Sequence, residues 1–195
     1  MNFLAHAFLS GENKELMIGN FIGDFIKGKQ YEKYSKEIQN GVLMHRAIDE
    51  YTDTHPIVSQ SKNRLRHKYR HYSGVIVDMA YDHLLAANWD QYHNLDLFAF
   101  TKQLYHTVDQ YSHLLPDSFR PMYTYMKRDN WLLQYAELEG IHRALSGMSR
   151  RTTFDSKMEE AIGDLRDQYQ GFELEFTRFM PDVIRFSEGW IENHV

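Results

Sequence analysis

The sequence predicts an all-α protein, a single-domain helical bundle. Apolar side chains recur at intervals of three and four residues along most of the chain, which is the period of an α-helix. Only four prolines and 11 glycines are spread over 195 residues, so helix-breaking positions are sparse. No segment repeats, is low in complexity or has the composition of a linker, and the length suits one domain, at residues 1–195.

The first half of the chain predicts three helices. Pro56 suits the first turn of the third, because the N–H that proline lacks would have no partner there. Glycine and polar residues predict turns before and after the first helix. The helices are expected at 13–27, 39–53 and 56–69, and the turns at 10–13 and 27–30.

The second half predicts four more helices. Gly74 precedes an apolar segment whose β-branched start, Val75 to Val77, also suits a strand. Pro116 and Pro121 mark a junction between two later helices, and Pro181 predicts a kink in the last one. The four helices are expected at 75–90, 96–114, 117–147 and 155–194.

The composition excludes several classes of protein. With no cysteine, the chain has no disulfide, thiolate metal site or cysteine nucleophile. A net charge of −5, from 22 basic and 27 acidic residues, argues against a wholly basic nucleic-acid binder. No apolar run approaches the roughly 18 residues of a membrane span, and the N-terminus lacks the basic start of a signal peptide. A cytoplasmic protein with no membrane partner is therefore expected.

Histidine and aspartate residues stand at helical spacing in two predicted helices. His45, Asp49 and Asp53 follow one another at four-residue steps, which places them on one face of a helix. In the apolar segment VIVDMAYDHLL, Asp78 and Asp82 are also four residues apart. A buried carboxylate is costly unless a cation or hydrogen-bond donors accompany it, so these acids need partners.

Two other apolar segments each carry one such residue, Asp24 in GNFIGDFIKG and His6 in MNFLAHAFL. Four segments therefore present acids or imidazoles from apolar surroundings, a pattern typical of a metal site between helices. Imidazole and carboxylate without thiolate suit Mn²⁺, Fe²⁺, Mg²⁺ or Zn²⁺. Taken singly, each feature also has a plainer interpretation: an ion pair for His45 and Asp49, a core histidine for His6, and a turn cap for Asp24.

Positive charge is concentrated in one segment. No acid lies between Asp53 and Asp78, and without the five cations of that stretch the chain has 17 basic against 27 acidic residues. This surface could steer an anionic partner, or it could simply be a solvated helix face. No zinc-finger, RRM or KH signature supports nucleic acid as the partner. The five cations are Lys62, Arg64, Arg66, Lys68 and Arg70.

The chain resembles the acyl carrier protein phosphodiesterases, also called holo-acyl-carrier-protein hydrolases, essentially from end to end. The order and spacing of the matching blocks carry this resemblance more than any single motif. The blocks are MNFLAH (1–6), GNFIGDFIKG (19–28), MHRAIDEYTDTHP (44–56) and DMAYDHLLAANW (78–89), with a looser match over 115–151.

The resemblance implies an all-α fold related to a rearranged HD-domain phosphohydrolase, although no His-Asp dipeptide occurs here and Asp82-His83 has the reverse order. It implies a divalent cation, Mn²⁺ first and Mg²⁺ or Fe²⁺ otherwise. It also implies release of 4′-phosphopantetheine from a serine of holo-acyl carrier protein, an acidic protein that the basic segment would attract.

Carried onto this chain, the resemblance implies three sets of residues. The expected metal ligands are His45, Asp49, Asp78 and Asp82. The expected catalytic residues are Asp24, His83 and His6, with one of the two histidines protonating the leaving oxygen. The expected substrate-binding residues are Arg46, Arg64, Arg66, Lys68 and Arg70.

Two other functions remain open from the sequence. The same centre could hydrolyse a small nucleotide-like phosphoester, in which case the basic segment would play no part in turnover. Alternatively, the chain could be a non-catalytic helical module that binds acidic proteins through its basic face and holds no metal.

Overall fold

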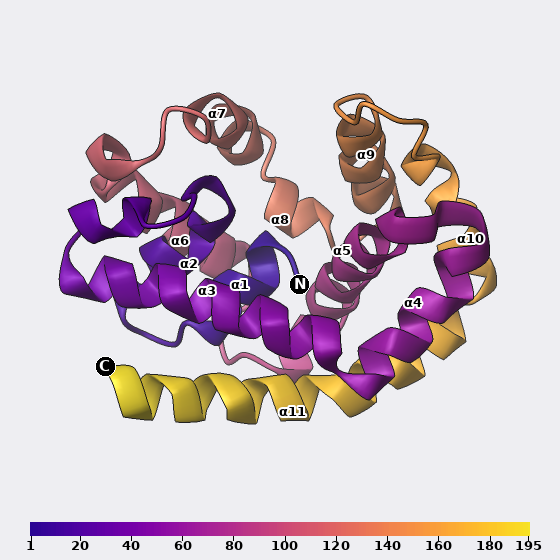
Figure 1. Ribbon diagram of the computed structural model, residues 1–195, viewed down its shortest axis with the longest axis horizontal. Coiled ribbons are helices and arrows are strands. Elements are labelled where there is room, and N and C mark those ends of the chain that lie inside the picture. The colour runs from indigo at the N-terminus through magenta and orange to yellow at the C-terminus, as the bar shows by residue number, and fades with distance from the viewer.

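The computed structural model describes all 195 residues and confirms an all-α protein with no strand. The chain forms eleven α-helices, α1 to α11, and short 3-10 turns lie between some of them (Figure 1). The helices are α1 Phe3–Leu9, α2 Lys14–Phe21, α3 Lys36–Thr54, α4 Pro56–Tyr69, α5 Ser73–Ala87, α6 Leu97–Gln110, α7 Arg120–Arg128, α8 Trp131–Gln134, α9 Leu138–Ser149, α10 Ala161–Asp167 and α11 Tyr169–His194.

The predictions for α3, α4 and α5 are confirmed to within a few residues at each end. Ser35 caps α3, because its hydroxyl accepts a hydrogen bond from Ile38 N, and α4 begins at Pro56 as expected. The β-branched residues that also suited a strand lie inside α5.

The first two helices differ from the expectation. The helix predicted over 13–27 ends at Phe21, and a 3-10 turn, η1 (Gly23–Phe25), follows it. Helix α1, of seven residues, was not predicted from the sequence. Such a short helix is unstable alone and depends on tertiary contacts for its hydrogen-bond partners.

The two long helices predicted in the second half are divided. Asn130 adopts a left-handed conformation, with φ 43°, and separates α7 from α8 within the segment 117–147. Lys157 is also left-handed, at φ 54°, and Gln168 separates α10 from α11. Neither break falls at a glycine or proline, so the usual signals were absent. Helix α11 runs through Pro181 without ending.

One hydrophobic cluster of 48 buried residues holds the helices together. Helix α5 contributes to it along its whole length, and α11 lies along one side of the molecule beside α3 and α4 (Figure 1). No helix is both long enough and apolar enough to span a lipid bilayer.

Helices α2 and α3 approach each other backbone to backbone. A Cβ atom on Gly19 would lie 2.1 Å from the carbonyl oxygen of Ile38, and one on Gly41 would lie 2.1 Å from that of Leu16. Only glycine allows such an approach, since any side chain would collide with main-chain atoms. The contact brings the end of α2 against the middle of α3, where His45 lies.

Candidate metal centre

Four side chains from three helical segments converge at one point. His45 Nε2 lies 3.2 Å from Asp24 Oδ1 and 3.2 Å from Asp49 Oδ2. His6 Nε2 lies 3.2 Å from Asp49 Oδ1. The two imidazoles are buried, with 2% and 5% of their side chains exposed, whereas the Asp24 side chain is 64% exposed. The cluster is therefore rooted in the core and open to solvent on its aspartate side.

Asn20, at the end of α2, orients both imidazoles. His6 Nδ1 donates to the side-chain oxygen of Asn20 over 2.7 Å, and His45 Nδ1 donates to its main-chain oxygen over 2.8 Å. The Asn20 amide nitrogen in turn donates to Ser10 Oγ and to the carbonyl of His6, which fixes the amide orientation. Because both Nδ1 atoms carry the proton, both Nε2 atoms of the neutral rings present lone pairs to the carboxylates.

Gly23 leaves the space that His45 occupies. A Cβ atom on Gly23 would lie 2.3 Å from Cγ of His45, so any side chain there would push the imidazole aside. The turn η1 begins at Gly23 and places the Asp24 carboxylate next to Nε2 of the same ring. The motif GNFIGD thus provides the orienting residue, the space and one carboxylate.

The four groups shift one another's ionisation. Burial, reinforced by neighbouring His45, lowers the pKa of His6 to about 4. Burial would also lower the pKa of His45, but its contacts with Asp24 and Asp49 raise it to about 9. The His45 contact likewise lowers the pKa of Asp24. The cluster therefore holds two ionised carboxylates and favours one positive charge between them.

A divalent cation fits this donor set. His6, His45 and Asp49 each present one ligand atom, and these atoms lie within 4.8 Å of one another. Imidazole nitrogen with carboxylate oxygen is a usual environment for Mn²⁺, Fe²⁺ or Zn²⁺. Without a cation or proton, the Nε2 lone pairs would face carboxylate oxygens, which is repulsive. The cluster could hold a metal through these three residues, with Asp24 beside them.

The structure places the other predicted ligands, Asp78 and Asp82, on different partners. Asp82 is fully buried and accepts hydrogen bonds from the main-chain N–H groups of Asn2, Leu4 and Ala5, so it caps the start of α1. Asp78 accepts a 2.8 Å hydrogen bond from the amino group of Met1. The charge of Asp49 helps to raise the pKa of Asp78, after burial, so Asp78 lies near the centre without joining it.

His83 also lies outside the cluster. Its Nδ1 donates to the carbonyl of Tyr135 over 2.8 Å, and its Nε2 lies 3.1 Å from the hydroxyl of Tyr169. These bonds tie α5 to the segment after α8 and to the start of α11.

The predicted substrate-binding cations divide into two groups. Three have partners within the chain: Arg46 donates to the carbonyls of Ile26 and Gly28, Arg64 pairs with Glu175, and Lys68 pairs with Asp164 and Glu160. Arg66 and Arg70 are exposed and make no ion pair. These two, rather than all five, are free to contact a partner.

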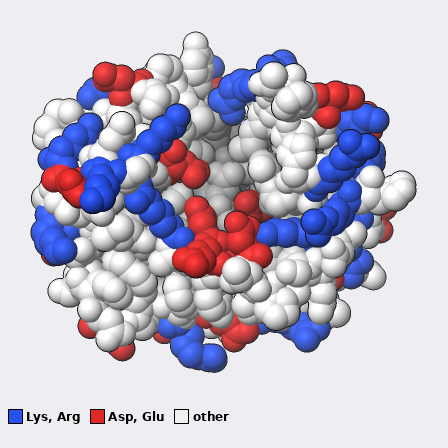
Figure 2. All heavy atoms as spheres, viewed as in Figure 1, with Lys and Arg blue, Asp and Glu red and all other residues white.

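Beside the centre lies a groove of about 920 Å³ between α7–α8 and α9. Figure 2 shows it as a hollow in one face of the molecule, with acidic side chains gathered at its edge and Lys and Arg on both sides. Its lining includes three arginines of α9 and the following turn: Arg143, Arg150 and Arg151.

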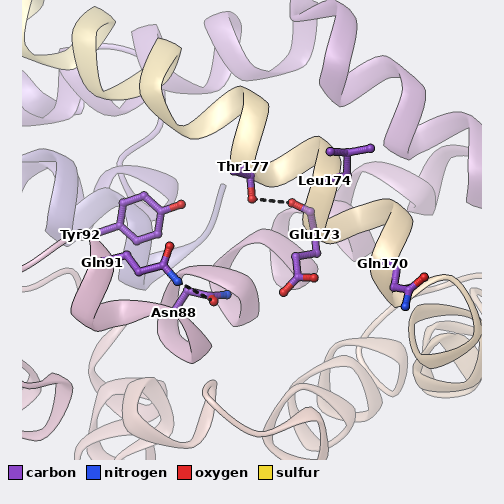
Figure 3. Close-up of a pocket in the computed structure, with 7 residues that line it drawn as sticks. All are labelled: Asn88, Gln91, Tyr92, Gln170, Glu173, Leu174 and Thr177. Atoms are coloured by element: carbon purple, nitrogen blue, oxygen red, sulfur yellow. Dashed lines mark hydrogen bonds between the residues drawn. The ribbon is translucent and has the colours of Figure 1, made fainter.

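A smaller pocket of about 280 Å³ lies elsewhere, between α11 and the turn η4 (Trp89–Gln91). Two of its polar side chains bond to neighbouring residues in Figure 3: Gln91 donates to Asn88, and Thr177 donates to the carbonyl of Glu173. It contains a single acid and no histidine, so it offers no comparable chemistry.

Sequence reasoning missed Asn20 and the role of α1. The signal for Asn20 was present, because it is the one polar residue between Leu16 and Gly23 in an apolar segment. For α1 the local signal was only its N-cap, Asn2, whose side chain accepts a hydrogen bond from Phe3 N; three further main-chain N–H groups bond to Asp82, about 80 residues further along the chain.

Comparison with known proteins gives a consistent result. The family described as acyl carrier protein phosphodiesterase matches residues 1–183. A protein of that name from Photorhabdus laumondii subsp. laumondii is 32% identical over 97% of this chain and 96% of its own length. One from Klebsiella pneumoniae strain 342 is 34% identical over 97% of this chain and 98% of its own. No solved structure matches.

Proposed function

The chain belongs to the acyl carrier protein phosphodiesterase family, and from this premise we propose that it removes 4′-phosphopantetheine from holo-acyl carrier protein. The reaction adds water across the phosphodiester, giving the apo carrier protein and free 4′-phosphopantetheine. The observation that carries the proposal is the convergence of His6, His45 and Asp49, with a groove large enough for a substrate lined by Phe3 of the same helix as His6.

We further propose that these three residues hold a divalent cation, Mn²⁺ first and Mg²⁺ or Fe²⁺ otherwise, with Asp24 beside it. When bound, such an ion would lower the pKa of a coordinated water and offset the negative charge of the phosphate. Asn20 keeps both Nε2 atoms directed at it, a role that outer partners commonly play for histidine ligands.

Asp24 is suited to accept a proton from the attacking water. It is the most exposed of the four groups, and the neighbouring His45 lowers its pKa, so the carboxylate is ionised at neutral pH. Neither predicted histidine is placed to protonate the leaving serine oxygen: the two ring nitrogens of His6 face Asn20 and the proposed cation, and His83 lies outside the cluster with its ring nitrogens directed at Tyr135 and Tyr169.

Four arginines without an ion pair are suited to an acidic carrier protein. Arg66 and Arg70 make no ion pair, and Arg150 and Arg151 line the groove without one. Complementary charge of this kind mainly accelerates encounter, and its effect weakens as salt increases.

The decisive experiment incubates the protein with holo-acyl carrier protein and Mn²⁺ and measures the mass of the carrier protein. Loss of one phosphopantetheine group is expected, and His45→Gln should abolish it. An unchanged mass with folded protein shown to bind Mn²⁺ would contradict the proposal. If a small phosphodiester were instead the true substrate, reversing the charge of Arg66 and Arg70 would leave turnover unchanged.

A further inference from the structure

The groove beside the metal centre has walls of mixed character. Aromatic and aliphatic side chains form one part of its lining, and the rest is polar, with guanidinium, amide and hydroxyl groups together with His142 and the two acids Asp129 and Glu139. Its volume of about 920 Å³ lies within the range of pockets that hold small ligands, about 300–1,000 Å³. The apolar lining comes chiefly from Phe3, Met122, Trp131, Ala144 and Met148.

Helix α1 links the groove to the centre. Phe3 lines the groove, and His6 follows three residues later on the same helix, a rise of about 4.5 Å. The Phe3 ring also stacks on Phe25, next to Asp24, with centroids 6.4 Å apart. A group held at His6 and Asp24 could therefore continue directly into the groove.

One polar group in the lining has no partner within the protein. Tyr135 is 2% exposed and lines the groove, and its hydroxyl makes no hydrogen bond to another residue, although it is not among the fully enclosed polar atoms that lack a partner. The hydroxyl is therefore accessible from the groove, where water or a ligand can satisfy it. The hydroxyl can donate to a carbonyl oxygen.

We propose that this groove holds the pantetheine arm of the substrate while its phosphate lies at the metal centre. The inference rests on the proposed function and adds where the arm lies and which residues select it. The arm is an uncharged chain of methylene and methyl groups with two amides. The apolar lining would contact its hydrocarbon part, and the Tyr135 hydroxyl would donate to an amide carbonyl.

Gly147 offers a way to block the groove without disturbing the fold. It lies in α9 and lines the groove, and a Cβ atom there would meet nothing within 4 Å. Gly163 in α10 is equally unobstructed but lies outside the groove lining, so it provides a matched control. A phenylalanine at either position is a better helix former than glycine.

The test compares Gly147→Phe and Gly163→Phe with the unmodified protein. We expect Gly147→Phe to reduce kcat/KM for holo-acyl carrier protein at least tenfold while hydrolysis of bis(4-nitrophenyl) phosphate and Mn²⁺ binding stay unchanged. Gly163→Phe should match the unmodified protein in all three. Tyr135→Phe should raise KM roughly two- to twelvefold, the loss of one hydrogen bond. Full turnover by Gly147→Phe would overturn the proposal.

Binding of free pantetheine, measured by calorimetry, separates this inference from the proposed function. The unmodified protein should bind pantetheine, and Gly147→Phe should bind it at least tenfold more weakly. If the protein binds pantetheine in this way but leaves holo-acyl carrier protein intact, the proposed function fails and the groove assignment stands. If it hydrolyses the carrier protein and both variants bind pantetheine equally, the groove assignment fails.

Discussion

The imidazole rings of His6 and His45 stack with their centroids 3.9 Å apart, at an interplanar angle of 22°. Both rings are held by oxygen atoms of one residue, Asn20, although they come from α1 and α3. Two imidazoles this close cannot both be protonated without strong repulsion, and the opposite pKa shifts of the two rings reflect this. Their shared orientation leaves both Nε2 atoms free for a single cation.

Replacing Asn20 should weaken metal binding without removing a ligand. Asn20→Leu deletes the acceptor of His6 Nδ1 but keeps the main-chain acceptor of His45. We expect Mn²⁺ affinity, measured by calorimetry, to fall about 10- to 100-fold, the usual effect of losing an outer partner of a metal ligand. Asn20→Asp, which keeps the acceptor, should recover part of this loss. Ser10→Ala is the control: it removes a hydroxyl that accepts from the Asn20 amide nitrogen and donates to the carbonyl of His6, but it leaves the acceptors of both Nδ1 atoms in place, so an equal loss of affinity there would contradict the prediction.

Metal binding should stabilise the fold. Mn²⁺ at about 100 times its Kd would add about 2.7 kcal/mol of stability. For a protein of this size each kcal/mol corresponds to roughly 2–4 °C, so we expect Tm to rise by roughly 5–11 °C and to fall again on adding a chelator. His45→Gln should abolish the shift, whereas His67→Gln, at an exposed histidine outside the centre, should preserve it. A shift that persists in His45→Gln would place the ion elsewhere.

Asp82→Ala should destabilise the protein while leaving the metal ligands in place. The substitution removes the acceptor of three main-chain N–H groups at the start of α1, at a cost of at least about 2 kcal/mol. In urea titrations the midpoint should fall, and at low temperature the folded variant should still bind one Mn²⁺. Complete loss of metal from a folded Asp82→Ala protein would instead support the role of ligand that the family resemblance implied.

Arg64 should contribute to stability rather than to substrate binding. Its guanidinium pairs with Glu175, whose side chain is 7% exposed and also accepts a hydrogen bond from Ser61. Arg64→Ala would leave that carboxylate buried without a cation, at a cost of about 3 kcal/mol, the lower end of the usual range because Arg64 is itself 35% exposed. Arg66→Ala, at an unpaired neighbour, should change the free energy of unfolding by less than about 0.5 kcal/mol. Similar unfolding free energies for the two variants would count against this assignment.

Charge reversal at Arg66 and Arg70 should weaken recognition of the carrier protein. We expect the double change to glutamate to raise KM for holo-acyl carrier protein several-fold at low salt, with a smaller effect at high salt because exposed charges are screened. Hydrolysis of bis(4-nitrophenyl) phosphate should not change. Lys102→Glu, at an exposed cation on α6, is the control. An unchanged KM in the double variant would show that Arg66 and Arg70 do not recognise the carrier protein, and Arg150 and Arg151 would then be the residues to replace.

The helical period of the sequence predicted the fold class, because it reports directly on which faces are buried. It did not predict α1, a short helix that depends on the distant Asp82 as well as on its own N-cap Asn2, nor the breaks at Asn130 and Lys157, where residues other than glycine adopt left-handed conformations. The ends of helices that depend on distant partners or on uncommon backbone angles cannot be predicted from the neighbouring residues alone.

For the candidate centre, four-residue spacing on a helix predicted which side chains share a face, but not what those side chains bind. His45 and Asp49 are neighbours because they lie one turn apart. Asp78 and Asp82 have the same spacing, yet the structure directs both to the start of the chain. A buried aspartate that binds a metal and one that accepts main-chain N–H groups look identical in a sequence, since both are acids in an apolar segment.

The glycine contact between α2 and α3 has a consequence for redesign of the protein. Because Gly19 and Gly41 bring main chain against main chain, the separation of Asn20 from His45 is fixed by backbone atoms. Repacking of neighbouring side chains would therefore change the spacing of the candidate ligand atoms very little. Changing the ion that the candidate centre prefers would require exchanging the donor atoms themselves.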